Sequence, residues 1–164
     1  IALSIASERP DIDVVATDVS PEAISVARRN RDALGLEDRV QLIECDLVSG
    51  VPKDCAETFC VLVSNPPYIP TEVLKTSVPA EVKEFEPKLA LDGGNDGLDV
   101  YRRLLQEAPH MLAPGGMLCV ELYEGHLGRA AELARQAGVW RDISIKEDLT
   151  HRPRILVAYR KEAE

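Results

Sequence analysis

Short apolar runs alternate with amphipathic stretches along most of this chain. The apolar runs are rich in β-branched residues and are too short for helices, so each predicts a strand. The expected strands are residues 13–17, 39–45, 59–63, 117–122, 143–146 and 154–159. Two of these runs, 13–17 and 59–63, are expected to be buried, as strands of a parallel sheet are. The amphipathic stretches predict helices at residues 1–7, 21–35, 99–112 and 125–137.

The helix that starts near residue 21 carries clear signals at both ends. Ser20 is a preferred N-cap residue, and Pro21 suits the first helical position because its missing N–H has no partner there. Gly35 is expected to end the amphipathic run.

Strands that alternate with helices predict an α/β fold, with a doubly wound and mostly parallel sheet. The last two expected strands have no helix between them, which favours an antiparallel pair at the edge of the sheet. Pro114-Gly115-Gly116 predicts a turn before the strand at 117–122. Residues 69–97 are rich in Pro and Gly and are expected to be mostly irregular, and a loop of that length usually has a function.

Length, charge and cysteine spacing restrict the class of protein. A chain of 164 residues predicts one domain, and its net charge of −9 disfavours a nucleic-acid partner, which requires a basic face. No apolar run is long enough for a membrane span and no signal peptide is visible, so no membrane partner is expected. The four cysteines form no CxxC pair. They are interpreted as reduced core residues of a cytoplasmic protein, with no metal or disulfide role.

The run Asn65-Pro66-Pro67-Tyr68 directly follows the apolar residues 59–63, so it is expected at the carboxyl edge of the sheet, where open α/β folds bind ligands. The Asn65 side-chain oxygen and the Pro66 carbonyl could each accept one N–H of a planar NH₂ group. Pro66 and Pro67 cannot donate to a sheet ladder, and Tyr68 offers a flat face for an amide or a base. The alternative is a simple turn that ends the strand.

Acidic side chains follow two other expected strands. Asp18 comes directly after 13–17, where a carboxylate can accept hydrogen bonds from ribose hydroxyls, and Asp46 ends the run 39–45, where it could accept from an adenine amino group. Each could instead be a loop aspartate, and Asp18 is close enough to Ser20 to serve the helix start. Together with Asn65-Pro66-Pro67-Tyr68 they predict one binding edge.

In this order and spacing, these residues resemble a class I, Rossmann-like methyltransferase that uses S-adenosyl-L-methionine and methylates an amino or amide nitrogen. The run Glu86-Pro87-Lys88-Leu89-Ala90-Leu91-Asp92-Gly93-Gly94-Asn95-Asp96-Gly97-Leu98 resembles the HemK-type protein-(glutamine-N5) methyltransferases, which modify peptide-chain release factors. This second run is not shared by the adenine methyltransferases that also use Asn-Pro-Pro-Tyr. Its Asp92-Gly93-Gly94 favours the release-factor branch over the ribosomal-protein branch.

The resemblance implies a role for each matching residue. The substrate would be the glutamine of the release factor's Gly-Gly-Gln loop. Asn65 and Pro66 would bind the target amide as the catalytic pair, with Pro67 and Tyr68 completing the substrate site. The implied cofactor contacts are Asp18, Asp46, Leu47 and Asn65. The histidines His110, His126 and His151 lie outside these motifs and are interpreted as surface or structural residues.

The chain departs from the family pattern at several points. Phe85 stands where the family often has Tyr, and Leu122-Tyr123 stands where it tends toward Ile-Gly. The family's first strand and glycine-rich loop would precede Ile1, so residues 1–164 are expected to be a catalytic domain that is incomplete at its N-terminus and inactive alone. Because that strand is central in the family order, no direct ladder is expected between the strands at 13–17 and 59–63.

Other functions would use some of the same residues. An N6-adenine nucleic-acid methyltransferase would share Asn65–Tyr68 but should carry a basic recognition region. A nicotinamide-dependent dehydrogenase would share the fold and Asp18 but gives no role to Asn65–Tyr68. A ribosomal-protein glutamine methyltransferase and a non-enzymatic domain that only binds partners also remain open.

Overall fold

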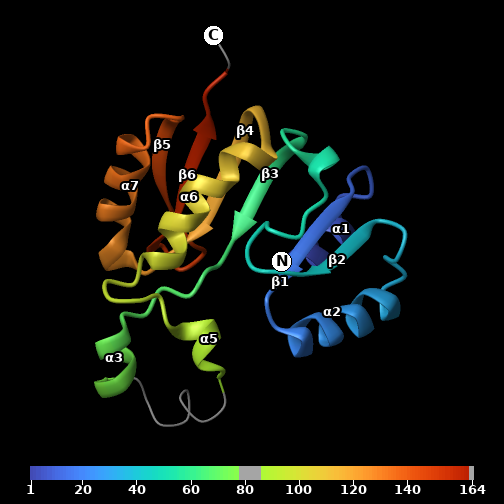
Figure 1. The fold of residues 1–164 in the computed structure, drawn as a ribbon, viewed down its shortest axis with the longest axis horizontal. Helices are drawn as coiled ribbons and strands as arrows, with labels where there is room; N and C mark the ends of the chain where they lie inside the picture. Colours follow the sequence, from blue (N-terminus) through green and yellow to red (C-terminus); the bar gives the residue numbers. More distant parts are fainter. Residues whose placement is uncertain (78–85, 163–164) are drawn as a thin grey trace. The chain divides into compact units, whose positions relative to one another are not determined.

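The computed structural model describes residues 1–77 and 86–162, which form two compact units, Ile1–Asp54 and Cys55–Glu164 (Figure 1). Their arrangement relative to each other is not determined, so each is described by itself. Phe85, one departure from the family pattern, lies outside the described residues.

The first unit is a two-stranded parallel sheet with helices. Its elements are α1 (Ala2–Glu8), β1 (Val14–Asp18), α2 (Pro21–Ala33) and β2 (Val40–Glu44), and the parallel register runs from Val14 opposite Val40 to Asp18 opposite Glu44. Ala6, Leu36 and Val40 form its small buried core. The guanidinium of Arg39 donates to the carbonyls of Ala6 and Arg9 at 2.6 and 3.1 Å, which fastens the end of α1 to the start of β2.

The helix signals read from the sequence are confirmed. The Ser20 hydroxyl accepts the Ala23 N–H at 3.1 Å, as an N-cap does, and Pro21 occupies the first position of α2. Gly35 follows the helix with a φ of +63°, a left-handed conformation that glycine adopts readily.

The second unit contains a mixed four-stranded sheet. Its elements are β3 (Phe59–Ser64), α3 (Thr71–Thr76), α5 (Lys88–Leu91), α6 (Asp99–Met111), β4 (Leu112–Glu121), η2 (Glu124–His126), α7 (Leu127–Gln136), β5 (Trp140–Glu147) and β6 (Pro153–Arg160), and η1 (Lys53–Cys55) precedes β3. The strand order is β3-β4-β6-β5, with β3 and β4 parallel and the other neighbours antiparallel. The expected antiparallel pair of final strands is therefore confirmed, with β5 at the edge. The expected lack of a direct ladder between β1 and β3 stays a prediction, because these strands belong to different units.

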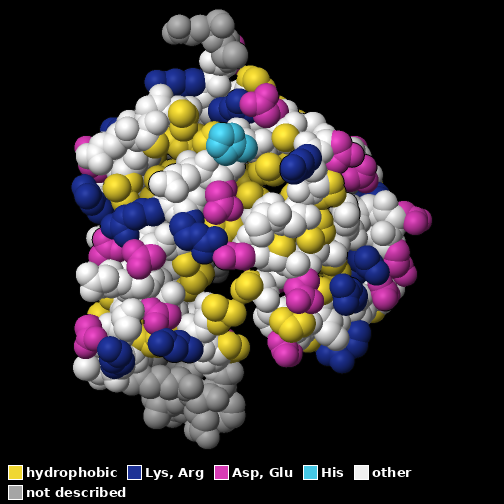
Figure 2. Space-filling model, in the orientation of Figure 1, with side chains coloured by type: hydrophobic (Ala, Val, Ile, Leu, Met, Phe, Trp, Pro, Cys, Tyr) yellow, Lys and Arg dark blue, Asp and Glu magenta, His cyan; other side chains and the backbone are white. Residues whose placement is uncertain are grey.

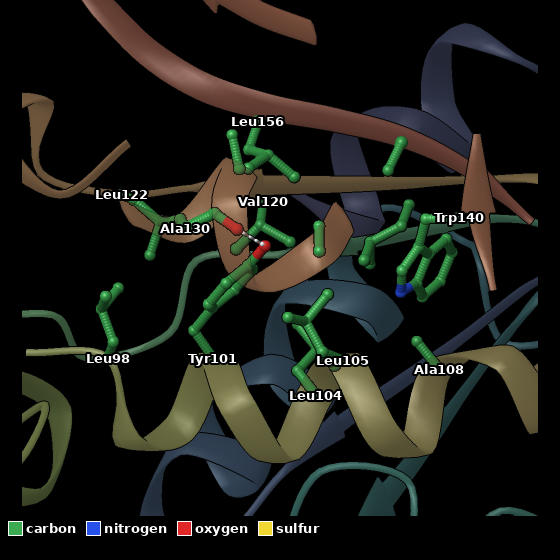
Figure 3. Close-up of a cluster of buried hydrophobic side chains, with 14 of the residues drawn as sticks. Leu98, Tyr101, Leu104, Leu105, Ala108, Val120, Leu122, Ala130, Trp140 and Leu156 are labelled. Atoms are coloured by element: carbon green, nitrogen blue, oxygen red, sulfur yellow. Dashed lines mark hydrogen bonds between the residues drawn. The ribbon is translucent and has the colours of Figure 1, made fainter. Parts of the chain in front are cut away.

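The core of the second unit lies between this sheet and two helices. The α6 side chains Tyr101, Leu104, Leu105 and Ala108 pack with β4, β6 and α7 (Figures 1 and 3). The hydroxyl of Tyr101 is buried and donates to the Ala130 carbonyl of α7 at 2.9 Å, so it links α6 to α7 (Figure 3). Burial raises the pKa of this hydroxyl, which stays protonated.

Three expectations about burial are wrong. No residue of β1 is fully buried, and in β3 the side chains of Val61 and Val63 are 46% and 40% exposed. The reason in β3 is that it is the first strand of its sheet, and only its Phe59 and Leu62 pack against the core. The cysteines, expected to be core residues, are not buried: Cys60 is exposed and the other three are half-buried.

One expectation about chain conformation is also corrected. Pro114-Gly115-Gly116 does not form a separate turn but lies inside β4, where the register with β3 is irregular and can accommodate Pro and Gly. Residues 69–77 and 86–97 contain the short helices α3 and α5, and the residues around these helices are irregular, as expected. The remainder of that loop, 78–85, lies outside the described residues.

Candidate active site

The run Asn65-Pro66-Pro67-Tyr68 leaves the carboxyl end of β3, as the sequence predicts. Asn65 is exposed, and its side chain makes no hydrogen bond to any other residue that the structure describes. Pro66 is buried, and Tyr68 is half-buried against the core of the second unit. The run therefore presents a free amide side chain from a backbone that packing and two proline rings make rigid.

A second segment, Asp92–Gly97, lies directly on this loop, and we call it the glycine strap. The Gly93 N–H donates to the Ile69 carbonyl at 2.8 Å, and the Thr71 N–H donates to the Gly94 carbonyl at 2.9 Å. Just before the strap, the Leu91 carbonyl accepts from the Ile69 N–H at 3.0 Å. The strap thus pairs with the residues directly after the candidate substrate loop, which gives a structural role to the run that carried the family resemblance.

The side chain of Asp92 reinforces the pairing. Its Oδ1 accepts from the Thr71 hydroxyl at 2.7 Å and from the Gly94 N–H at 3.0 Å, and its Oδ2 lies 3.5 Å from the ammonium of Lys88. The Thr71 hydroxyl, and then the Gly94 N–H, hold the pKa of the Asp92 carboxyl below its usual range, because both favour the charged form.

Two positions of the strap must be glycine because the backbone of the Asn65–Tyr68 loop lies very close to them. A Cβ on Gly93 would lie 2.8 Å from both the Pro67 carbonyl oxygen and the Tyr68 Cα, too close for real atoms. Gly97 has a φ of +75°, and a Cβ there would meet the Tyr68 carbonyl oxygen and approach Cε1 of His126 to 2.6 Å. Any larger residue would push the strap off the loop.

Ion pairs hold the C-terminal end of the strap. Arg102, on α6, donates to Asp96 at both carboxylate oxygens and to Asp99 at 2.8 Å, and the Leu98 N–H donates to Asp96 at 3.2 Å. The Arg102 guanidinium lowers the pKa of Asp96 to about 2. The strap is therefore fixed to the loop at one end and to α6 at the other.

The candidate cofactor residues lie in the first unit. Asp18 ends β1, and its carbonyl accepts from the Cys45 N–H at 2.9 Å, so Asp18 and the nearby Asp46 come to the same edge of the two-stranded sheet. Both side chains are exposed. One oxygen of Asp18, Oδ1, accepts from the Ser20 N–H at 2.8 Å. Asp18 therefore also stabilises the turn at the start of α2, the role considered as an alternative to ribose binding. Leu47 is half-buried beside Asp46, with a φ of +49° that is uncommon outside glycine.

The structure brings Asp18 together with Asp46 in one unit, and Asn65–Tyr68 together with the strap in the other. The meeting of the two groups at one edge stays a prediction. Among the described residues no cluster of His, Cys, Asp and Glu could hold a metal ion, and no helix is long and apolar enough to cross a membrane.

The sequence interpretation missed one neighbour of the loop. His126, set aside as surface or structural, touches the side of Gly97 that also faces Tyr68. No motif in the sequence points to it, because it lies far from both runs and only the fold brings it there.

Comparison with known proteins then decides the family. Residues 1–85 match the family described as "Methyltransferase small domain". The chain belongs to this methyltransferase family. The resemblance to release factor glutamine methyltransferases, read from Asn65–Tyr68 and Glu86–Leu98, is also confirmed by relatives of that name.

Two of these relatives show how much of each protein the match covers. Release factor glutamine methyltransferase of Moorella thermoacetica is 44% identical over 165 residues, covering 99% of this chain and 56% of that protein. The one from Clostridium acetobutylicum is 37% identical over 160 residues, covering 98% of this chain and 55% of that protein. The chain spans about half the length of the curated relatives it matches.

Solved structures confirm the fold class. A methyltransferase from Pyrococcus furiosus matches with a TM-score of 0.67 at 21% identity, over 96% of this chain and 68% of that one. The ribosomal protein L11 methylase of Lactobacillus delbrueckii subsp. bulgaricus matches with a TM-score of 0.61 at 18% identity, over 98% of this chain and 64% of that one. The chain thus has the Rossmann-like fold of class I methyltransferases.

Proposed function

We propose that the protein containing this chain transfers a methyl group from S-adenosyl-L-methionine to the side-chain amide nitrogen of a glutamine in a peptide-chain release factor. In this proposal residues 1–164 form the catalytic domain of a cytoplasmic enzyme. The observation that carries it is the Asn65–Tyr68 loop, against which the glycine strap packs and directly after which the strap pairs with Ile69 and Thr71. The names of the relatives support the same substrate class.

The loop suits an amide target. An amide nitrogen is a poor nucleophile because its lone pair is delocalised, so orientation is the main contribution a protein can make. The exposed Asn65 oxygen would accept one N–H of the target and the Pro66 carbonyl the other, which fixes the plane of the NH₂ group. Both oxygens would also stabilise positive charge that develops on the nitrogen. The half-buried ring of Tyr68 would pack beside the target side chain.

The residues of the first unit fit the nucleoside part of the cofactor. The Asp18 carboxylate keeps Oδ2 available beside the Oδ1 that the Ser20 N–H occupies, and it is exposed at a strand end, where ribose hydroxyls are commonly bound. Asp46 can accept from the adenine amino group, and the apolar side chain of Leu47 stands next to it. When bound, S-adenosyl-L-methionine supplies a methyl group on a positively charged sulfur, which is a strong electrophile.

The distribution of charge disfavours a nucleic-acid substrate. Lys and Arg side chains lie interspersed with Asp and Glu on the face shown in Figure 2, and the chain has a net charge of −9. Binding to phosphates requires several basic groups on one face.

The test is methyl transfer by the full-length protein with radiolabelled cofactor. We expect label in the intact release factor and none in a release factor whose Gly-Gly-Gln glutamine is replaced by alanine. Ribosomal proteins and DNA are assayed in parallel. Label in DNA alone, or in a ribosomal protein alone, would overturn the proposed substrate.

A further inference from the structure

Glu121 ends β4 next to the point where the candidate substrate loop begins. The parallel register of β3 and β4 places Ser64 opposite Val120, so the next residues along the two strands, Asn65 and Glu121, lie at the same level of the sheet. Neighbouring strands are about 4.8 Å apart. A carboxylate side chain therefore starts one strand away from the amide side chain that would hold the target.

The two side chains also point to the same face of the sheet, because side chains alternate between faces along a strand. Val120 and Leu122 are buried in the core that the sheet forms with α6 and α7, so Glu121 between them points to the opposite face (Figure 3). On β3, Leu62 packs against the same core. Alternation from Leu62 puts Asn65 on the opposite face, where it is exposed.

The Glu121 carboxylate has no partner in the described part of the chain. It is half-buried, yet it makes no hydrogen bond or ion pair with any described residue. Arg154 precedes Ile155, which pairs with Glu121 in the ladder, but its guanidinium lies over the Tyr123 ring, 5.9 Å from the ring centroid. The carboxylates of the glycine strap, by contrast, are bonded to Lys and Arg side chains. A partly buried charge without a partner is destabilising, so it calls for a role.

Methyl transfer to an amide creates positive charge at the position where Asn65 would hold the target. As the amide nitrogen forms a bond to the methyl carbon, the methyl–sulfur bond breaks and its electron pair stays on sulfur. The positive charge therefore moves from sulfur to nitrogen, until one N–H proton is released to water. A fixed negative charge on the nitrogen side of this reaction stabilises the transition state more than the ground state.

We propose that Glu121 is a further catalytic residue of the methyl-transfer site, whose carboxylate lies against the target NH₂ group beside Asn65 and stabilises the positive charge that develops there. Asn65 and Pro66 would orient the NH₂ group through two neutral oxygens, and Glu121 would supply the negative charge that these oxygens lack. The inference rests on the proposed function and deepens it, because it names a group that lowers the barrier to transfer.

Glu121→Gln tests the charge, because it keeps the size of the side chain. In the full-length protein we expect kcat with a release factor to fall about tenfold, with KM and the melting temperature nearly unchanged. Glu121→Asp keeps the charge one methylene further back and should lose only about threefold. Glu147→Gln is the control and should keep wild-type kinetics, because Glu147 is exposed at the end of β5, two strands away from β4.

A binding measurement separates the charge from any structural role without turnover. In a peptide of the target loop, ornithine in place of the target glutamine puts an ammonium group where the amide nitrogen would lie. Calorimetry in the presence of S-adenosyl-L-homocysteine should show that Glu121→Gln weakens binding of the ornithine peptide about tenfold and leaves binding of the glutamine peptide unchanged. A structural role would weaken the binding of both peptides equally.

Each outcome decides the role of Glu121. Methyl transfer by Glu121→Gln at the wild-type rate, or equal weakening of both peptides, would overturn this role and leave the proposed function standing. Equal losses of kcat in Glu121→Gln and Glu121→Asp would also overturn it, because only one of these variants removes the charge. If the wild type methylates no release factor, the proposed function fails and the role of Glu121 fails with it.

Discussion

The hydroxyl of Thr71 donates to the carboxylate of Asp92 at 2.7 Å, joining two segments that lie 21 residues apart in the chain. The same carboxylate oxygen accepts the Gly94 N–H, so one acidic side chain organises both the start of α3 and the glycine strap. The site's rigidity therefore depends on a residue that would not contact the target amide.

Replacing Asp92 with alanine should loosen the strap. Thr71 and Gly94 would each lose an acceptor, so amide exchange at Gly93 and Gly94 should quicken about fivefold or more, since one hydrogen bond contributes about 1 kcal/mol. Asp92→Asn is the matched control, because its side-chain oxygen can still accept from both donors. Unchanged exchange in Asp92→Ala would show that backbone pairing alone holds the strap.

The Asp96–Arg102 pair should contribute stability that disappears in acid. The folded pKa of Asp96 is lowered to about 2, below the unfolded value of about 3.9, so its contribution is present above the unfolded pKa and lost as pH falls toward 2. The side chains are 46% and 36% exposed, so we expect less than about 1 kcal/mol. The free energies of unfolding of the wild type and Asp96→Asn should differ at pH 7 and converge near pH 2. A difference independent of pH would contradict this.

Asn65→Ala should reduce turnover and leave cofactor binding almost unchanged. A preorganised group of this kind contributes about 2.7–4 kcal/mol to transition-state stabilisation, so kcat should fall about 100- to 1,000-fold. The cofactor Kd, measured by calorimetry, should change little, since Asn65 is assigned chiefly to the target amide. Asn65→Asp keeps an oxygen acceptor and serves as the comparison. Near-normal turnover in Asn65→Ala would remove Asn65 from the mechanism.

Asp18→Asn should weaken cofactor binding before it affects any other property. The amide oxygen can still accept the Ser20 N–H, so α2 keeps its start, but a neutral oxygen binds ribose hydroxyls less strongly than a carboxylate. We expect the cofactor Kd to rise about 10- to 100-fold, with the melting temperature unchanged. An unchanged Kd would assign Asp18 to the turn alone.

Tyr101→Phe should destabilise the second unit without touching the site. It removes the buried bond to the Ala130 carbonyl and keeps the ring, so the free energy of unfolding should fall by about 0.5–1.5 kcal/mol in urea titrations. Tyr159→Phe is the control, because no hydrogen bond of its hydroxyl is seen in the described part of the chain. Equal effects in both variants would contradict the role given to the Tyr101 bond.

Local signals predicted the parts of the fold that depend on local chemistry. Ser20 and Pro21 marked the start of α2 because capping is decided within one turn of helix. The antiparallel pairing of β5 with β6 followed from the short connection between them. The loop after β3 was found for the same reason, since a strand followed by two prolines must end.

Burial and contacts between residues far apart in the chain could be predicted less well from the sequence. The apolar run of β3 predicted a buried strand, yet burial depends on how many neighbours the strand has, and Val61 and Val63 are exposed at the edge of the sheet. The family resemblance singled out Asp92-Gly93-Gly94 without saying what these residues do. Their role emerges only when Gly93 is seen against Pro67 and Tyr68. His126 carried no signal at all, because its neighbours are brought to it by the fold.

The place of β3 at the end of its strand order has a consequence for handling the protein. A terminal strand presents unpaired backbone N–H and C=O groups, and here the apolar side chains of Val61 and Val63 accompany them. Such an edge is a template for any extended segment in solution. At high concentration, residues 1–164 purified alone should therefore self-associate through Phe59–Ser64, and a charged substitution such as Val61→Lys should keep them dispersed.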